Sequence, residues 1–370
     1  MELHRHWLQG LVASLLLLPS VSWSIPISLG AAADYNTVVF GDFEASGSDT
    51  EGRLAIGGNA VLHDYSVGLL LGERSLGSSL VVGGNLDLNQ GRIDYGNLHV
   101  IGDAQITQAA IDHGDVYIGH HLNFSGASIE NGDLIVGGNL VFNQAEVKNG
   151  LVTTTGMVIG DESAENLSLQ TPIITPTQPP APFNFESEAA YLKALANDLS
   201  LLPANGVSQL EFDTNLQLIG DGTNGLQIFH LEGDELLNAT SIELANVQND
   251  AVVLINVEGE QSGFTQMGFN QLMMDMSSRL LFNFYQTTTL EITSVGINGS
   301  ILAPYAHINS HSGQINGTTI AASWNGNVQQ NHVRFLVPTP PIISLLLVGL
   351  WLLWLSHRQA NDRQPLYRRP

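Results

Sequence analysis

The sequence predicts an all-β fold, a triangular β-solenoid (β-helix) with about 18 residues per coil and one long α-helix packed along its side. Three observations predict it: an ungapped 18-residue repeat, alternation of apolar and polar residues within each repeat, and a closing glycine. The repeats begin at Leu86, Ala104, Leu122 and Leu140 and read LDLNQGRIDYG, AQITQAAIDHG, LNFSGASIENG and LVFNQAEVKNG. Such a short period, rich in β-forming residues and glycine, is typical of stacked coils.

Apolar columns through the repeats predict which side chains face the interior. Alternation with period two is a strand pattern, because successive side chains of a strand point to opposite faces. Residues between the apolar positions, such as Asp87, Gln105 and Asn123, are expected to face outward. The inward columns are Leu86, Ala104, Leu122 and Leu140; Leu88, Ile106, Phe124 and Phe142; Ile93, Ile111, Ile129 and Val147; Leu98, Val116, Leu134 and Val152; and Val100, Ile118 and Val136.

The corners of the predicted coils are also regular. Asn85, Asp103, His121 and Asn139 form one column just after glycine-containing corners, and Asn and Asp suit a tight turn. Gly57-Gly58-Asn59 carries the same corner upstream, before an irregular insertion near Gly68–Ser79. The tripeptides that start at Ile297 and Ile315 are separated by the same period, so the solenoid is expected to resume there.

One helix is predicted, over about residues 185–202. Asn184 caps it, Glu186 and Glu188 lie in the first turn where the helix dipole favours them, and Pro203 ends it. We expect its apolar stripe to pack lengthwise against one side of the solenoid. The stripe consists of Phe185, Ala189, Leu192, Leu195, Ala196, Leu199 and Leu202.

A proline-rich connector over Thr171–Pro182 precedes this helix, and strand-like segments follow it. These strands are expected to add coils or to cap the stack. They are Gln209–Ile219, Leu226–Leu231, Ser241–Leu244, Ala251–Val257 and Arg279–Phe284.

Both ends of the chain carry targeting features. Residues 1–24 form a signal peptide, with an apolar run and a small-x-small site at Ser22-Trp23-Ser24. Residues 25–336 form the solenoid domain. Residues 337–370 hold a proline motif, the apolar run Ile342–Leu355 and a basic tail, which predict a transmembrane or sorting helix whose basic flank stays cytoplasmic.

Composition excludes several functions. Between the two ends, the chain has 33 acidic residues but only seven lysines and arginines. Such a surface repels phosphate backbones, so no nucleic-acid binding is expected. The chain has no cysteine, so its stability depends on packing and backbone hydrogen bonds. It also lacks G-x-S-x-G, the P-loop and H-E-x-x-H, and we expect no enzyme.

Two resemblances follow from motifs. The C-terminal region, with its sorting signal at Val337, Pro338 and Pro340, is similar to the bacterial PEP-CTERM signal that exosortases read, although the motif V-P-T-P lacks the usual Glu. Residues 29–335 resemble the choice-of-anchor A domain, through LGAAADYN, VFGDF, SDTEGRLAIGGN, GLQIF, VLINV and GSILAP. The resemblance implies an exported bacterial adhesive module of β-solenoid plan, with no catalytic residues to transfer, and its plan is also similar to that of ice-binding proteins.

Metal ligation is one hypothesis for the outward residues. Asp94, Asp112 and Glu130 would stack coil on coil, where like charges repel, and a bound Ca²⁺ would relieve that repulsion. Lys148 on the next coil offers an alternative remedy. His113 and Asp115, with His120 and His121, are further candidates for a metal site; otherwise these residues merely cover the solenoid faces.

An uncharged polar ladder is the candidate ligand face. It consists of Asn89, Thr107, Ser125 and Asn143, which could bind glycan, collagen or ice or simply hydrogen-bond along the stack. An ice-binding face would require repeated Thr, and only one of the four is Thr. Trp324 beside Asn325 could stack on a sugar.

The sequence thus predicts an exported, envelope-anchored adhesin-like or matrix-structural protein of a Gram-negative bacterium, with a role in biofilm. It would lie at the outer envelope, cell surface or extracellular matrix, membrane-attached at least transiently through its C-terminal helix. Its partners would be an extracellular glycan, a matrix protein or neighbouring cells, with an exosortase-type enzyme for processing. The alternatives are an ice-binding protein of similar plan and, third, a β-helix enzyme acting on polysaccharide.

Overall fold

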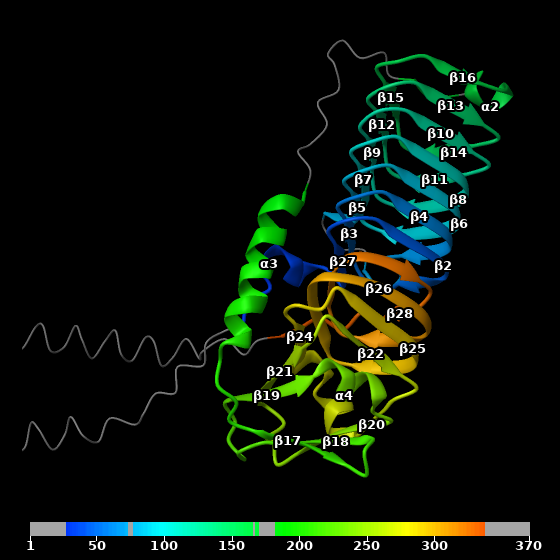
Figure 1. Ribbon diagram of the computed structural model, residues 1–370. Coiled ribbons are helices and arrows are strands. Elements are labelled where there is room, and N and C mark those ends of the chain that lie inside the picture. The colour runs from blue at the N-terminus through cyan, green and yellow to red at the C-terminus, as the bar shows by residue number, and fades with distance from the viewer. Residues whose placement is uncertain (1–26, 73–76, 166, 170–181, 337–370) are drawn as a thin grey trace, which may run out of the picture.

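The computed structural model describes residues 27–72, 77–165, 167–169 and 182–336 (Figure 1). Within these ranges, 24 strands form one large sheet and four strands form a smaller one. The pairings of the large sheet are parallel, and its successive coils lie one above another in Figure 1. The predicted all-β class is confirmed.

The upper stack comes from the first half of the chain. Its strands pair at the predicted register, as in Leu86 with Ala104, Leu122 with Ala104 and Leu122 with Leu140. A short 3-10 helix, η1 (Gly30–Asp34), precedes it. The strands are β1 (Thr37–Val39), β2 (Phe43–Thr50), β3 (Leu54–Ile56), β4 (Ala60–Val67), β5 (Ser78–Val82), β6 (Leu86–Tyr95), β7 (Asn97–Val100), β8 (Ala104–His113), β9 (Val116–Ile118), β10 (Leu122–Ser125), β11 (Ser128–Asn131), β12 (Leu134–Val136), β13 (Leu140–Asn143), β14 (Glu146–Asn149), β15 (Val152–Thr154) and β16 (Val158–Gly160).

The predicted inward columns form the core of this stack. Phe124 and Phe142 are buried one above the other, with ring centroids 5.7 Å apart. Of the predicted column members, Val147 alone is only partly buried, because among the described residues β16 covers β13 and Leu169 covers β15 but no strand covers β14. The insertion near Gly68–Ser79 lengthens one coil, so that Ala60 pairs with Leu86, which lies more than one regular period further along the chain.

Three corners separate three strand segments in each regular coil. Two are the predicted glycine corners; at Gly119 an added Cβ would lie 1.9 Å from Ile101 O, so no larger residue fits. The third corner holds residues with left-handed backbone, at Gln90 (φ 55°), Gln108 (φ 52°) and Gln144 (φ 46°). Left-handed backbone is unfavourable for residues with a Cβ, and nothing in the sequence marks glutamine for it.

The helix expected over 185–202 is α3 (Phe185–Ser200), with Asn184 as its N-cap: the side chain of Asn184 accepts from Ser187 N at 3.1 Å. Leu192, Ala196 and Leu199 are buried against an outward column of the stack that includes Val81. Burial of one leucine contributes about 1.5–3 kcal/mol. Figure 1 shows α3 lying lengthwise beside the coils.

The second half of the chain supplies the lower coils and a cap. The expected single strand Gln209–Ile219 is wrong: it is a hairpin, because Phe212 (φ 51°) and Asp213 (φ 63°) turn the chain between two strands. Four strands form the smaller sheet, β17 (Val207–Glu211), β18 (Asn215–Ile219), β20 (Ser241–Ala245) and β23 (Gly268–Phe269). The other elements are β19 (Leu226–Glu232), β21 (Val252–Glu258), β22 (Gln261–Thr265), β24 (Leu280–Phe284), β25 (Thr289–Asn298), β26 (Ser300–Asn316), β27 (Thr319–Gly326), β28 (Gln329–Gln330), the helices α2 (Glu162–Glu165), α4 (Gly233–Asn238) and α5 (Gln271–Asp275), and η2 (Ser277–Arg279).

The lower coils join the upper stack through the first coil of the chain. Thr37 in β1 pairs with Thr319 in β27 on one side and with Leu54 in β3 on the other. The coils recur where expected, with Ile297 paired to Ile315. Trp324 is not a sugar platform, because it is 2% exposed and its ring stacks on Phe43 in the core, with centroids 5.8 Å apart.

Several expectations concern residues outside the described ranges. They are the signal peptide, most of the proline-rich connector, the sorting motif and the apolar run Ile342–Leu355. Among the helices of the described residues, none combines the length and apolar character needed to cross a membrane.

Candidate functional site

A groove of about 590 Å³ runs along one side of the upper stack. It crosses the coils that contain β4, β6, β8, β10 and β13, which follow one another in Figure 1. Two columns line it: the corner column Asn59, Asn85, Asp103, His121 and Asn139, and the outward strand residues Val61, Asp87, Gln105, Asn123, Val141 and Ile159. The site is therefore long and repetitive.

The corner column is a continuous hydrogen-bonded ladder. Asn59 Oδ1 accepts from Asn85 N at 3.0 Å, Asn85 Oδ1 from Asp103 N at 2.9 Å, and Asp103 Oδ1 from His121 N at 2.9 Å. Asn139 Oδ1 extends it by accepting from Met157 N at 2.9 Å. Each side chain thus satisfies a backbone donor that the turn exposes, which fixes one wall of the groove.

His121 occupies one rung of this ladder. Its Nδ1 accepts from Asn139 N at 2.9 Å, so this nitrogen carries no proton and the proton of the neutral ring lies on Nε2. The exposed histidine thus presents a donor to the groove while serving the same structural role as its Asn and Asp neighbours.

The outward column changes character along the groove. Its ends are apolar, with Val61 44% and Ile159 53% exposed, whereas Asp87, Gln105 and Asn123 make the middle polar. One carboxylate oxygen of Asp87, Oδ1, is shielded and has no hydrogen-bond partner among the described residues. An extended ligand would meet amides and a carboxylate between apolar ends.

The expected ligand ladder lies beside this groove. Asn89, Thr107, Ser125 and Asn143 stand in register on β6, β8, β10 and β13, two residues beyond the groove column. They do not line the groove, and Ser125 Oγ instead donates to Asn123 Oδ1 at 2.8 Å. Of the four residues, Ser125 therefore supports the groove column directly.

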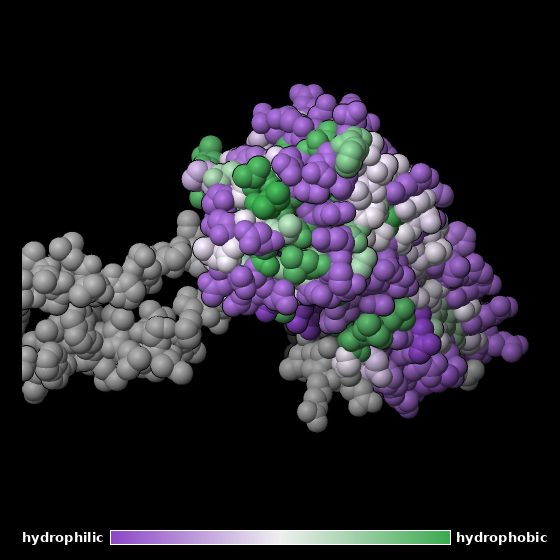
Figure 2. All heavy atoms as spheres, turned by 90° about the horizontal axis from the view of Figure 1, so that it is seen from below, coloured by the Kyte–Doolittle hydropathy of each residue, from purple (hydrophilic) through white to green (hydrophobic). Residues whose placement is uncertain are grey.

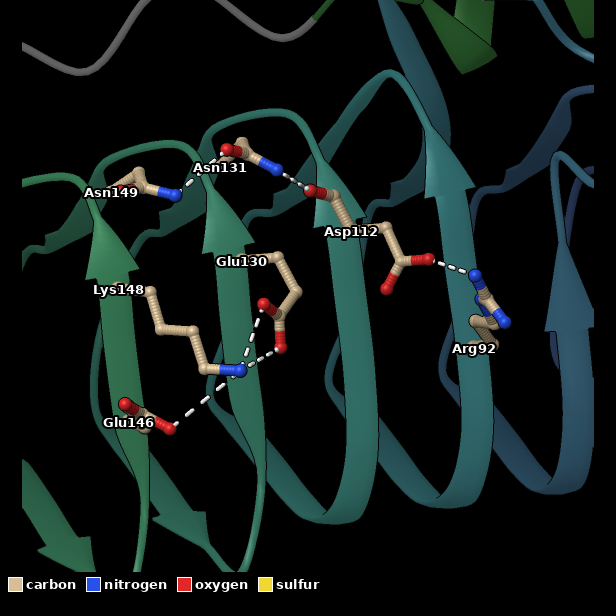
Figure 3. Close-up of polar contacts among 7 residues, drawn as sticks. All are labelled: Arg92, Asp112, Glu130, Asn131, Glu146, Lys148 and Asn149. Carbon is tan, nitrogen blue, oxygen red and sulfur yellow. Dashed lines mark hydrogen bonds and ion pairs between the residues drawn. The ribbon is translucent and has the colours of Figure 1, made fainter.

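The residues considered for a metal pair with cationic or neutral groups (Figure 3). Arg92 forms ion pairs with both Asp94 and Asp112, and Lys148 Nζ lies 2.7 Å from Glu130 Oε1. These cations relieve the repulsion within the stacked carboxylates. Within the described part of the chain, no three His, Cys, Asp or Glu residues gather as a metal site.

The further metal candidates lie at or next to the corners: His121 is the rung described above, and the backbone of His120 donates to Gly102 O at 3.1 Å. His113 stacks on Tyr95, with ring centroids 4.8 Å apart. Asp115 Oδ1 accepts from Asp133 N at 2.9 Å, and its Oδ2 accepts from Tyr117 OH at 3.0 Å. Burial, together with the hydrogen bond to Asp115, raises the pKa of Tyr117 to about 12.

Sequence reasoning named both groove columns but assigned neither as the site. Asn85, Asp103, His121 and Asn139 were expected as a corner, and Asp87, Gln105 and Asn123 as an outward face. The sequence signal that could have identified the site is that the two columns are adjacent. A corner column and a strand column two residues away enclose a groove when the side chains of the strand column protrude. A groove of amides with apolar ends is suited to binding a polymer along its length.

Taken together, the stacked parallel coils and the surface groove define a repetitive β protein with a long binding surface on one side. The chain belongs to the family described as "Putative Ice-binding-like adhesive domain", whose model matches residues 28–130 and 100–332. No curated protein matches the chain.

Solved structures with similarity to the chain were also found. A possible adhesin C-terminal domain from Caldicellulosiruptor kronotskyensis is 12% identical, with 87% of this chain and 97% of that chain covered and a TM-score of 0.23. An ice-binding protein from an Antarctic bacterium, Flavobacteriaceae, is 11% identical, with 85% and 99% covered and a TM-score of 0.22. The Tapirin C-terminal domain of Caldicellulosiruptor kristjanssonii is 12% identical, with 85% and 96% covered and a TM-score of 0.20.

Proposed function

We propose that the protein is an exported, envelope-anchored adhesin that binds an extended extracellular polymer, a glycan or a matrix polypeptide, in the groove. The observation that carries the proposal is the groove itself, whose corner ladder and outward column repeat coil after coil. A polymer with repeated polar groups would find repeated partners there, and many weak contacts in series give useful avidity.

The finer features of the prediction belong to this proposal. The parallel coils form a triangular β-solenoid over residues 25–336, of the choice-of-anchor A type. Residues 1–24 direct export, and residues 337–370 attach the protein to the envelope of a Gram-negative bacterium through a PEP-CTERM-like signal. The three corners per coil and the regular register support the solenoid.

The polymer is expected to be neutral or cationic. The groove contains Asp87 and Asp103, and the region between the two ends of the chain has a large excess of acidic residues. A polyanion would therefore be repelled as it approached. This expectation separates neutral glycans and basic peptides from sulfated or uronic-acid polymers.

The test is binding of the full chain to a glycan and matrix-protein array, with and without Ca²⁺. Gln105→Trp and Asn123→Trp fill the groove, and we expect them to abolish binding to whichever probe the parent protein retains. Ser128→Trp on β11, outside the groove lining, is the matched control and should bind normally. Binding that survives both groove substitutions would refute the proposal.

Ice binding is the second candidate, and the family description favours it. Its test is thermal hysteresis and inhibition of ice recrystallisation by the same protein. If the protein is active in these assays and Gln105→Trp leaves that activity intact, ice binds to another face, and ice binding would replace polymer binding as the first candidate function.

A further inference from the structure

The upper end of the stack terminates in an open strand edge. β14 pairs with β11 through Ser128–Glu146, Ile129–Val147 and Asn131–Asn149. Within the described ranges, no strand pairs with its other edge. Such an edge presents unpaired N–H and C=O groups and is a ready template for another strand. In Figure 3, β14 is the strand that carries Glu146, Lys148 and Asn149.

The segment that covers the upper end of the stack, the upper cap, leaves space beside this strand. α2 and residues 167–169 cover part of the last coil, and Leu169 forms a bridge with Val152 on β15. A cavity of about 430 Å³ separates Ser163 and Leu167 of the upper cap from Val147 and Phe142 below. The end of the stack is thus closed over β15 and hollow next to β14.

The charges of β14 are self-complementary. Glu146 and Lys148 face outward on either side of Val147, and their side chains are 61% and 41% exposed. If two copies of β14 pair antiparallel about a two-fold axis through Val147, Glu146 of each copy lies opposite Lys148 of the other. Opposite charges directly across a strand pair stabilise it, and a two-fold interface requires this kind of self-complementary surface.

We propose that two copies of this protein associate end to end through antiparallel pairing of β14 with β14 of the second copy. The occupant is a second copy because Lys148, one of only two lysines in an acidic chain, alternates with Glu146 on this strand, so that the edge complements itself. Within its own copy Lys148 Nζ also binds Glu130 Oε1 at 2.7 Å, and the closely placed second carboxylate of the partner strand would share that cation. Nearby apolar side chains, Leu151 at 39% and Leu169 at 49% exposed, add surface that the contact would cover. This association is independent of the groove, which lies on the side of the stack.

Charge reversal with mixing tests the proposal. All variants carry Glu130→Gln, so that reversing Lys148 creates no repulsion with Glu130 inside one copy. Glu146→Lys gives a strand with two positive charges, and Lys148→Glu gives one with two negative charges. We expect each variant alone to dimerise about tenfold more weakly than the parent, and their equimolar mixture to form heterodimers at about the parent affinity.

The readout is the mass of the full chain in detergent against concentration, by analytical ultracentrifugation, with thermal melts to show that each variant is folded. Val147→Pro, which removes a backbone donor from the edge, should also abolish dimers. A parent that is monomeric at every concentration would overturn the proposal. Dimers of unchanged affinity in both single variants would also overturn it, and would point to association through the C-terminal apolar run. The same holds if the equimolar mixture dimerises no more tightly than either variant alone.

Discussion

Asn283 and Asn256 form a buried amide pair beneath α3. Nδ2 of Asn283 donates to Asn256 Oδ1 and to the backbone oxygen of Ala196 in the helix, both at 2.8 Å. Asn256 Nδ2 in turn donates to Leu199 O at 2.9 Å. The two side chains, 0% and 1% exposed, therefore hold two helix carbonyls against the strands β24 and β21.

Loss of one member of this pair should weaken the attachment of α3. Asn283→Leu keeps the volume but leaves Asn256 Oδ1 buried without its donor, so we expect the free energy of unfolding to fall by about 2 kcal/mol in urea titrations. Asn149→Leu is the matched control: its Nδ2 donates to Asn131 Oδ1 at 3.0 Å at an exposed site, and its loss should change stability by under about 0.5 kcal/mol. Equal effects of the two substitutions would contradict the role of the buried pair.

Phe212 offers the opposite case, a residue whose replacement should stabilise the fold. It is 91% exposed and adopts φ 51° at the tip of the β17–β18 hairpin. These strands lie at the lower end of the molecule, where separate apolar patches interrupt a polar surface (Figure 2). Phe212→Gly should raise the free energy of unfolding by about 0.5–1 kcal/mol, because glycine adopts positive φ without strain.

Phe212→Ala separates the two contributions to this effect. Alanine removes the aromatic ring but keeps the Cβ that makes positive φ costly, so it should give little or no gain in melting temperature. If alanine stabilises the protein as much as glycine, exposure of the ring and not the backbone is the cause.

Gly119 should tolerate no side chain in its present backbone conformation, although the equivalent corner position holds Ile101 on one coil and Thr155 on another. An alanine Cβ at Gly119 would meet Ile101 O, and the coils have no room to separate, so Gly119→Ala should cost at least about 3 kcal/mol or prevent folding. Gly72→Ala is the control, since no atom of the described residues lies within 4 Å of its added Cβ. Far-ultraviolet circular dichroism during thermal melting distinguishes the two variants; a Gly119→Ala protein as stable as Gly72→Ala would contradict the close stacking.

Acid sensitivity should arise partly from His99. This side chain is 2% exposed, in register with Val81 and Tyr117, and burial lowers its pKa below the usual value of about 6.5. The unfolded state therefore binds the proton more tightly, and the stabilisation from the neutral ring is full above pH 6.5 and is lost as pH falls through the lowered pKa. His99→Phe should flatten the dependence of stability on pH in that window, as measured by urea titrations from pH 7.5 to 4.5. A variant whose stability falls with pH as steeply as that of the parent would contradict this origin.

Much of this fold could be predicted because the repeat is local. Period-two alternation predicts the burial of Leu88, Ile106 and Phe124, and the constant spacing of the repeats predicts how these residues pair between coils. The corner at Gln90 could not be predicted, since glutamine has no preference for left-handed backbone and the stacked neighbours impose it. Trp324 misled for a related reason, because its burial depends on Phe43, which lies far away in the sequence.

The groove was the hardest feature to predict. Its wall depends on Asn85, Asp103 and His121 acting in series, and a histidine in an Asn and Asp column looks like an interruption until its Nδ1 is seen to accept the same bond. The pairing of Arg92 with Asp112 and of Lys148 with Glu130 could not be predicted completely either. Lys148 was recognised, but Arg92 reaches two carboxylates on different coils only once they are stacked.

The pairing of Thr37 with Thr319 also sets the order in which the protein matures. The first coil can pair on both of its edges only after β27, close to the other end of the domain, has been synthesised. Because this contact joins residues far apart in the sequence, closure of the stack should be slow. Once the stack has closed, both edges of β1 are paired at the junction, so neither edge is available to a protease.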